Sequence, residues 1–238
     1  MIPDKNPHQD RPYIICHMAV TIDGKVTGDF FYKHDVTDYF IVGDEFNADA
    51  FCCGKNTFQE SYGKDLDLSI YKNKNKNGLK DFIVKENSKK FLICFDRKGS
   101  INWPFNLLPP GPTTSKKFEN AHVVIVLTEK ANEDYLSFLQ DKKISYIIAG
   151  KEDTDLKLAL KKIKELLGVN FLLLEGGSII NGSFQREKFV DEISVVLVPS
   201  VEDKSSKPLF YDSVFEEYEL KDVKKLKNSN LWITYKKK

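Results

Sequence analysis

The residues with the clearest chemical potential are Glu175, Gly176, Gly177 and Ser178, which follow the apolar run Phe-Leu-Leu-Leu. Two adjacent glycines let a chain turn sharply and bring its N–H groups close to a ligand. Ser178 is predicted to cap a helix that begins here. The N-terminus of such a helix favours an anion, typically a nucleotide pyrophosphate. A tight strand-to-helix turn that binds nothing fits the same residues.

Two other apolar runs end in polar residues. Residues 21–25 read Thr-Ile-Asp-Gly-Lys and present Asp23 and Lys25 at the end of a predicted strand, where open α/β sheets bind ligands. Taken alone, Asp-Gly predicts a hairpin turn. Residues 54–57 read Gly-Lys-Asn-Thr, so a backbone N–H and the Thr57 hydroxyl could reach a phosphate, although a capped short helix fits equally. Three such strand ends together predict a cleft.

Composition excludes several classes of protein. The 238 residues are 41% hydrophobic and carry 36 Lys and Arg against 35 Asp and Glu, a balance that argues against binding to nucleic acid. No apolar run is long enough for a membrane span, and residues 1–7 lack a signal core. The four cysteines and four histidines show no metal-site spacing. We therefore expect a cytoplasmic protein with reduced thiols, no metal site and a small-molecule substrate.

Strand-like and helix-like patterns alternate along the chain. The helix-like stretches are 35–46, 133–142 and 155–167, with Asn132 as an N-cap and Gly168 as a C-cap. This alternation predicts an α/β fold with a mainly parallel central sheet and helices on both faces. Residues 231–235 are expected to pair antiparallel with 192–199 as C-terminal edge strands. The predicted strands are 13–20, 50–54, 91–95, 122–127, 145–149, 171–175 and 192–199.

The chain is interpreted as a single domain, 1–238. Residues 1–10 form an N-terminal extension, and residues 64–90 contain a Lys/Asn-rich loop insertion. The motifs GxGxxG and GxxxxGK[ST] are both absent, which argues against an ordinary dinucleotide fingerprint and against a P-loop.

Three segments resemble one family in the same order and at similar spacing, over residues 11–200. The segment RPYIICHMAVTIDGKV resembles the start of the reductase domain of bacterial riboflavin biosynthesis proteins. The segment ADAFCCGKNTFQES is similar to that family's A-D-A-x-x-x-G-x-x-T segment and to a segment of dihydrofolate reductases. The segment LLLEGGSIINGSFQREKFVDEISVVLVPSV resembles the family's E-G-G segment and the strand after it.

The resemblance implies a dihydrofolate-reductase-like fold, NADPH as the hydride donor and, often, a homodimer. It implies that Asp23, Lys25 and Glu175 face the substrate as catalytic residues. For the NADPH 2′-phosphate, Lys55, Arg97 and Lys98 stand at or just after strand ends. The cofactor-binding residues that the resemblance implies are Gly54, Thr57, Ser61, Gly176, Gly177, Ser178 and Ile179.

One departure from the family concerns the substrate. Where family members have D-D-P-x-L-x-x-R, which helps to bind the ribose phosphate, residues 61–68 read Ser-Tyr-Gly-Lys-Asp-Leu-Asp-Leu. Either lysines replace the phosphate-binding arginine, giving a point charge in place of a bidentate fork, or the substrate differs.

The expected activity is NADPH-dependent reduction of 5-amino-6-(5-phosphoribosylamino)uracil in riboflavin biosynthesis. In this interpretation Lys25 or Asp23 assists proton transfer, and Glu175 orients hydroxyl groups. The first alternative is a reductase of the same fold that acts on a pterin or another heterocycle, for which an acid on the first helix is needed. The second alternative is a non-catalytic nucleotide-binding protein. The candidate acids on that helix are Asp35, Asp38, Asp44 and Glu45.

Overall fold

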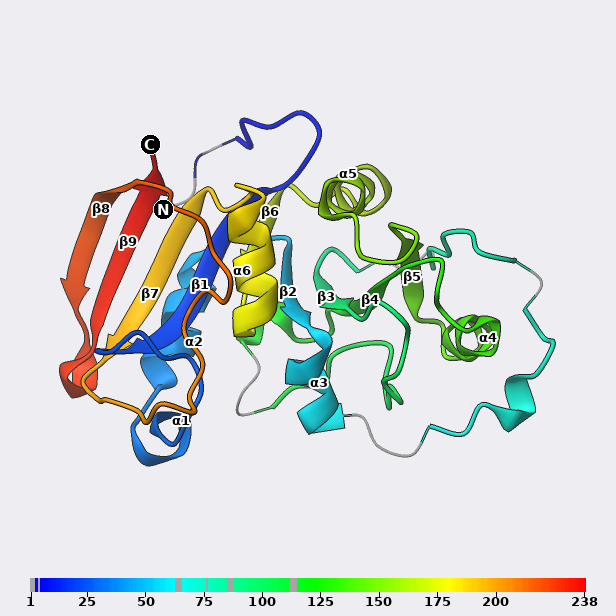
Figure 1. Ribbon diagram of the computed structural model, residues 1–238, viewed down its shortest axis with the longest axis horizontal. Helices are drawn as coiled ribbons and strands as arrows, with labels where there is room; N and C mark the ends of the chain where they lie inside the picture. Colours follow the sequence, from blue (N-terminus) through cyan, green and yellow to red (C-terminus); the bar gives the residue numbers. More distant parts are fainter. Residues whose placement is uncertain (1–2, 4, 63–65, 76, 85–87, 112–114) are drawn as a thin grey trace. The chain divides into compact units, whose positions relative to one another are not determined.

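The structure is a computed structural model that describes residues 3, 5–62, 66–75, 77–84, 88–111 and 115–238, with the backbone alone described at 60–62 (Figure 1). The strands are β1 (Tyr13–Thr21), β2 (Ala50–Gly54), β3 (Phe91–Phe95), β4 (His122–Leu127), β5 (Ser145–Ile148), β6 (Phe171–Leu174), β7 (Glu192–Val198), β8 (Tyr218–Lys225) and β9 (Leu231–Lys237). The α-helices are α1 (Phe30–Lys33), α2 (Thr37–Glu45), α3 (Lys55–Tyr62), α4 (Glu133–Asp141), α5 (Leu156–Leu167) and α6 (Ser178–Arg186).

The chain divides into two compact units, which we describe separately. The first unit contains Met1–Lys5, Tyr13–Ala48 and Phe171–Lys238, and the second contains Asn6–Pro12 and Asp49–Asn170. The prediction of a single domain over 1–238 stays a prediction.

Strand β1 is the centre of the first unit, whose strands follow the order β6-β1-β7-β9-β8. It pairs parallel with β6, Tyr13 beside Phe171, and with β7, Ile15 beside Glu192. Strand β9 pairs antiparallel with β7, which confirms the predicted C-terminal pair. Strand β8 adds a second antiparallel strand that the sequence did not reveal. Its residues are almost all exposed, so no apolar alternation marks it.

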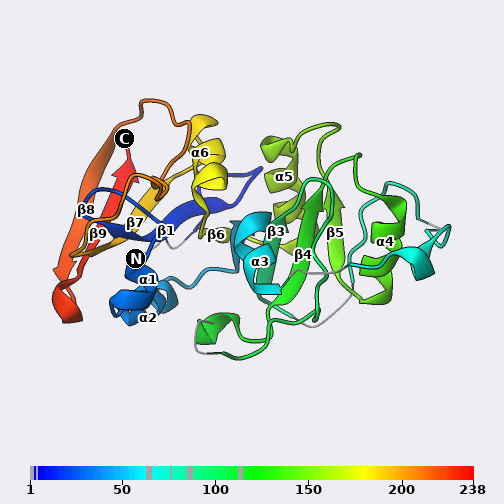
Figure 2. The same cartoon turned by 60° about the horizontal axis from the view of Figure 1, so that its bottom comes forward.

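Both faces of β1 are covered, since all nine of its residues are buried. On one face Ala19 packs with Phe30 of α1 and Val198 of β7. On the other face Met18 lies against the turn before α6, because a Cβ added to Gly176 would be 3.1 Å from Met18 Cε. Helix α6 (yellow) and helices α1 and α2 (blue) accordingly lie on opposite sides of β1 (Figures 1 and 2). This confirms helices on both faces for the first unit.

The second unit contains parallel strands in the order β5-β4-β3-β2. Strand β4 is buried throughout, as its apolar run predicts. The two predicted caps are confirmed: the Asn132 side chain accepts a hydrogen bond from Asp134 N, and Gly168 ends α5 in the left-handed region with φ 71°. Asp155, predicted as the first residue of that helix, is its N-cap and accepts a hydrogen bond from Leu158 N.

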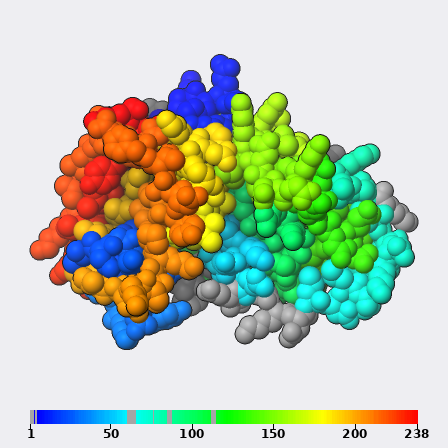
Figure 3. Space-filling view, in the orientation of Figure 1, coloured from blue at the N-terminus to red at the C-terminus, as the bar shows by residue number. Residues whose placement is uncertain are grey.

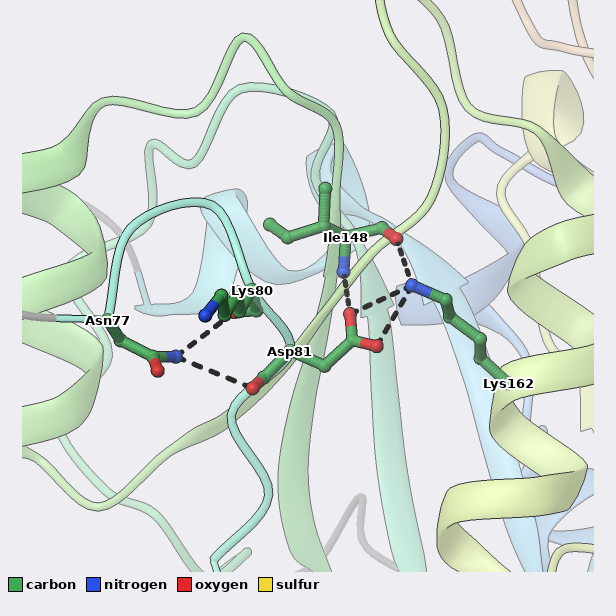
Figure 4. Close-up of polar contacts among 5 residues, drawn as sticks. All are labelled: Asn77, Lys80, Asp81, Ile148 and Lys162. Carbon is green, nitrogen blue, oxygen red and sulfur yellow. Dashed lines mark hydrogen bonds and ion pairs between the residues drawn. The ribbon is translucent and has the colours of Figure 1, made fainter.

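The described parts of the 64–90 loop are attached to the edge of β5. Phe82 exchanges two backbone hydrogen bonds with Tyr146, 2.9 and 2.8 Å long. The Asp81 carboxylate accepts a hydrogen bond from Ile148 N at 2.8 Å and pairs with Lys162 Nζ at 2.9 Å (Figure 4). The predicted loop is therefore a cover for an otherwise open sheet edge, a common way to prevent edge-to-edge association.

Helix α6 packs on the segment that follows β7, residues 199–217, called the linking segment below. Tyr211 N donates to Ser178 O at 3.1 Å, and Asn181 Nδ2 donates to Leu209 O at 3.1 Å. Figure 3 shows this segment in orange on the surface beside the yellow helix. A Cβ on Gly182 would stand 1.6 Å from Tyr211 O, so only glycine fits this contact.

We predict that Gly182→Ala lowers the free energy of unfolding by about 1–3 kcal/mol, the usual cost of overpacking. Chemical denaturation measures the change. Gly43→Ala is the matched control on another helix of the same unit, since its Cβ would meet only the His17 ring, with Nε2 at 3.4 Å and Cδ2 at 3.5 Å. The control is expected to be neutral or to gain up to about 1 kcal/mol from helix propensity. Equal stabilities for the two variants would contradict the close contact.

Candidate active site

Residues 21–25 form a closed turn at the end of β1. Thr21 N donates to Lys25 O, and Gly24 N donates to Thr21 O, both at 2.9 Å. Gly24 has φ +79°, a value that glycine adopts without strain. The turn that Asp-Gly predicts is confirmed, and it presents Asp23, which is exposed, and Lys25, which is partly buried.

Asp23 is held as a carboxylate. The Thr21 hydroxyl donates to Asp23 Oδ1 at 2.6 Å, and Glu202 N donates to the same atom at 3.3 Å. The Thr21 hydrogen bond is the main cause that lowers the pKa of Asp23, with smaller contributions from backbone N–H groups and the Lys25 charge against slight desolvation. A carboxylate of this kind accepts hydrogen bonds and is a poor proton donor at neutral pH.

The Lys25 ammonium group is available to a ligand. Within the described part of the chain its side chain has no hydrogen-bond or ion-pair partner, although its charge acts on both Asp23 and Asp203. An ammonium carries three donors and no acceptor. Lys25 can therefore donate to an oxygen or nitrogen of a substrate bound at this end of β1.

Glu175 directly follows β6, the parallel neighbour of β1. Burial of its carboxyl group raises the pKa of Glu175 to about 8, and the negative charge of Asp44 adds to this effect. A hydrogen bond with the Tyr39 side chain acts in the opposite direction. Since desolvation disfavours the charged form, Glu175 is largely protonated at neutral pH. It can donate a proton as well as accept hydrogen bonds.

The turn at 176–179 leads into α6. Helix α6 has Gly177 as its N-cap and no side-chain capping bond, so the prediction that Ser178 caps the helix is wrong. The Ser178 hydroxyl instead donates to Pro208 O at 2.5 Å, because the linking segment lies within its reach. Gly176 has φ +91°, and the peptide bond between Gly176 and Gly177 is cis.

This helix start has the features of an anion site. The first N–H groups of a helix have no intrahelical partner, and here no side chain caps them. Ile179 is exposed, Gly177 is partly exposed and Ser178 is buried. Asn181 Oδ1 is buried without a hydrogen-bond partner among the described residues, and the Nδ2 atom of the same side chain would lie 3.9 Å from a Cβ on Gly176. These donors and this acceptor fit the phosphate and amide or hydroxyl groups of a dinucleotide.

The linking segment joins the two turns of the first unit. Leu209 N donates to Gly24 O at 3.0 Å, and Val26 N donates to Lys207 O at 2.9 Å. Next to them, Pro208 O accepts from Ser178. The segment thus places the turn that carries Asp23 and Lys25 beside the start of α6. Nothing in the sequence of residues 207–209 signals this role.

The remaining cofactor candidates belong to the second unit. Gly54 ends β2, Thr57 is exposed in α3, and Ser61 lies in α3 with a side chain outside the described residues. Lys55 Nζ donates to Ser100 Oγ at 3.3 Å. Arg97 is paired with Asp153, so its guanidinium is already engaged.

The four acidic residues considered for the pterin alternative have different surroundings in the structure. The Asp35 side chain accepts from Asn228 at 2.8 Å, and Asp38 accepts from Asn230 at 3.1 Å. Glu45 is exposed. Only Asp44 acts on Glu175. Sequence reasoning missed Tyr39, which also acts on Glu175, because an aromatic residue at helical spacing is usually interpreted as core.

Comparisons with known proteins identify the family. Residues 12–232 match the RibD C-terminal domain, so the chain belongs to this family. It is 26% identical, over 80% of its length and 79% of the relative's, to the 2,5-diamino-6-ribosylamino-4(3H)-pyrimidinone 5′-phosphate reductase of Methanothermobacter thermautotrophicus. A relative that is named as a reductase, together with the family match, supports an oxidoreductase function for the chain.

Solved structures share the fold. A pyrimidine reductase-like protein from Corynebacterium diphtheriae has a TM-score of 0.68 at 19% identity, covering 96% of this chain and 93% of that chain. A deaminase/5-amino-6-(5-phosphoribosylamino)uracil reductase from Thermotoga maritima has a TM-score of 0.61 at 18% identity, covering 97% of this chain and 58% of that chain. These likenesses confirm the predicted reductase fold.

The described residues were also compared with the predictions that the chain has no membrane span and no metal site. Within them, no helix is both long and apolar enough to span a membrane. The same residues contain no cluster of three or more His, Cys, Asp or Glu side chains with the geometry of a metal site.

We predict that Glu175→Gln changes how stability depends on pH. The folded-state pKa of about 8 lies above the ordinary 4.5, so the folded state binds the proton more tightly and wild-type stability falls as pH rises between these values. Glu175→Gln has no such proton to release. The free energy of unfolding of the variant minus that of the wild type should therefore increase by at least about 1 kcal/mol from pH 5 to pH 8, because one pKa unit is worth about 1.36 kcal/mol. Denaturation curves at both pH values measure it. Parallel changes in the two proteins would contradict the raised pKa.

Proposed function

We propose that the protein is an NADPH-dependent reductase that reduces the ribosylamino group of a pyrimidine phosphate in riboflavin biosynthesis. The observation that carries the proposal is that Asp23 and Lys25 follow β1 and Glu175 follows its parallel neighbour β6, whose last residue Leu174 pairs with Cys16, five residues before the end of β1. The uncapped start of α6 follows directly after Glu175. Membership in the RibD C-terminal domain family supports the same reaction class.

Two substrates fit this class. The sequence resemblance suggested 5-amino-6-(5-phosphoribosylamino)uracil, which is named for the Thermotoga maritima relative. The Methanothermobacter relative is named for the 2,5-diamino pyrimidinone, and it is the more similar in sequence, at 26% against 18%. The two rings differ in one substituent, whereas the reacting ribosylamino carbon is the same. We propose reduction at that carbon and rank the 2,5-diamino compound first.

The chain's residues supply binding and proton transfer. NADPH, when bound, supplies the hydride that adds to the imine carbon of the ring-opened sugar. The addition places an electron pair on the amine nitrogen, which then takes a proton. The Lys25 ammonium group and the protonated Glu175 are the two proton donors of the site, and the Asp23 carboxylate orients Lys25 and the sugar hydroxyls. The N–H groups of Ser178 and Ile179 hold the pyrophosphate.

Further cofactor residues are proposed from the family resemblance alone. Gly54 would allow close approach of the cofactor, and Thr57 and Ser61 would contact its phosphates. Lys55 and Lys98 are the cations for the 2′-phosphate, since Arg97 is already paired with Asp153. Charge-assisted contacts to that phosphate favour NADPH over NADH.

The test of this function is cofactor oxidation by the purified protein under anaerobic conditions, followed by absorbance. The two pyrimidines and dihydrofolate are offered separately, each with NADPH and with NADH. We expect turnover with a ribosylaminopyrimidine phosphate and faster turnover with NADPH. Turnover with dihydrofolate alone would favour the pterin alternative, which the Asp44 position supports. Cofactor binding without any turnover would favour the non-catalytic alternative.

We further propose a cytoplasmic homodimer. Strand β8 ends the strand order of the first unit and exposes the apolar side chains of Leu220 and Val223, 58% and 51% exposed. Exposed apolar side chains that lie close together are a candidate contact surface for a second copy of the chain. Light scattering of the purified protein would give twice the chain mass, and a monomer at assay concentration would argue against the dimer.

Lys25→Met is predicted to lower kcat by about 10²–10⁴-fold, the usual range for general acid–base assistance, because the stem remains while the ammonium group is lost. Cofactor affinity, measured by calorimetric titration, should not change. Lys204→Met, a substitution at an exposed site in the linking segment, is the matched control and should retain full activity. A rise in KM alone would assign Lys25 to substrate binding. Unchanged kinetics would remove it from the site.

A further inference from the structure

Tyr39 of α2 stands between the buried core and Glu175. Its ring stacks on the His17 imidazole, with the ring centroids 4.6 Å apart and the planes 5° from parallel. Because Leu174 pairs with Cys16, Glu175 comes beside His17 and so next to Tyr39, and a hydrogen bond from the Tyr39 side chain lowers the pKa of Glu175 against the effect of burial. Tyr39 thus has its ring on a residue of β1 and its hydroxyl on the residue that follows β6.

The partners of His17 fix which atom donates and which accepts in each of its hydrogen bonds. Tyr39 O can only accept, so His17 Nε2, 3.0 Å away, must carry the proton. Trp232 Nε1 can only donate, and it donates to Ser194 Oγ at 2.9 Å. The Ser194 hydroxyl then donates to His17 Nδ1 at 3.0 Å. Both ring nitrogens are satisfied by the neutral form of His17.

His17 is a fixed support because it is fully buried. Burial is the largest cause that lowers the pKa of His17, to about 4, so the imidazole stays neutral at physiological pH. Phe46 packs edge-on to it, with centroids 5.6 Å apart. Tyr39 therefore stacks on a ring that is neutral at physiological pH and is held by packing and by hydrogen bonds at both ring nitrogens.

We propose that Tyr39 is a positioning residue that sets the orientation and protonation of Glu175, and that neutral His17 holds Tyr39 in place. The proposal rests on the proposed function, in which Glu175 transfers a proton. The Tyr39 hydroxyl donates to the ionised carboxyl group and so favours its charged form. Desolvation and Asp44 favour the neutral form. The groups on α2 thus bring the acid close to the pH at which it must exchange a proton.

The titratable groups that act on the Glu175 carboxyl group are Tyr39 and Asp44, both on α2. Tyr39 lowers and Asp44 raises the pKa of Glu175, so the proposal predicts the direction of the shift in each variant. Removal of the Tyr39 hydroxyl should raise the pKa of Glu175, and removal of the Asp44 charge should lower it. A merely structural role for Tyr39 would leave the pKa of Glu175 unchanged when the hydroxyl is removed.

The experiment is an NMR titration of the full chain with carbon-13 in its glutamate carboxyl groups. The Glu175 signal is assigned by its loss in Glu175→Gln. In Tyr39→Phe, which keeps the ring on His17, the Glu175 midpoint should rise by about one unit, because a hydrogen bond to a charged group is lost. Asp44→Asn should lower the midpoint. Tyr71→Phe, which removes a hydroxyl–carboxylate bond to Asp141 in the second unit, is the matched control and should leave it unchanged.

An unchanged or lowered midpoint in Tyr39→Phe would overturn the proposal. The titration needs no substrate, so an inactive protein with a raised midpoint would reject the proposed function and retain the role of Tyr39. With an active protein, the basic limb of the kcat–pH profile should move upward in Tyr39→Phe. In the Glu175→Gln background the same substitution should leave the profile unchanged, because the two residues act as one unit.

Discussion

The rest of the first unit depends on the burial of β1 between two parallel neighbours and two helical layers. All nine residues of the strand are buried, so β1 has no room for polar side chains that lack partners. Inside the strand, the His17 imidazole is accommodated because both of its ring nitrogens have partners. The polar residues that can meet a ligand follow the strands: Asp23 and Lys25 come after β1, and Glu175 comes after β6, whose last residue Leu174 pairs with Cys16.

The surroundings of the two carboxyl groups that follow these strands shift their pKa values in opposite directions. Asp23 is exposed and accepts hydrogen bonds from Thr21 and Glu202, which stabilise its charge. Glu175 loses water and feels the negative charge of Asp44, which disfavours its charge. One acid is therefore ionised and the other largely protonated at neutral pH. A pair of titratable groups separated in this way can divide orientation and proton transfer between them.

The linking segment explains how turns from distant parts of the chain keep their positions. Backbone groups of Lys207, Pro208 and Leu209 bond to the Gly24 turn and to Ser178. These contacts use the backbone, which every residue type possesses, so they leave little trace in the sequence. Gly182 is the exception, because its missing side chain makes room for Tyr211 O.

Strands and helix ends that depend on residues within the same short segment could be predicted from the sequence. Strands β2, β3 and β4 match their predicted bounds because short apolar runs between polar residues mark buried parallel strands. Asn132 and Gly168 define helix ends through their own side chain or backbone freedom. The family was equally evident, since its motifs lie in three short segments that residues 12–232 retain.

Features that depend on residues distant in the sequence became visible only in the folded structure. Strand β8 exists because β9 offers a pairing edge, and its charged residues carry no pattern of their own. Ser178 does not cap α6 because Pro208 O, thirty positions away, competes for its hydroxyl. The protonation of Glu175 depends on Tyr39 and Asp44, which reach it only through folding. Local propensity acts over a few residues, whereas desolvation and side-chain partners are set by packing.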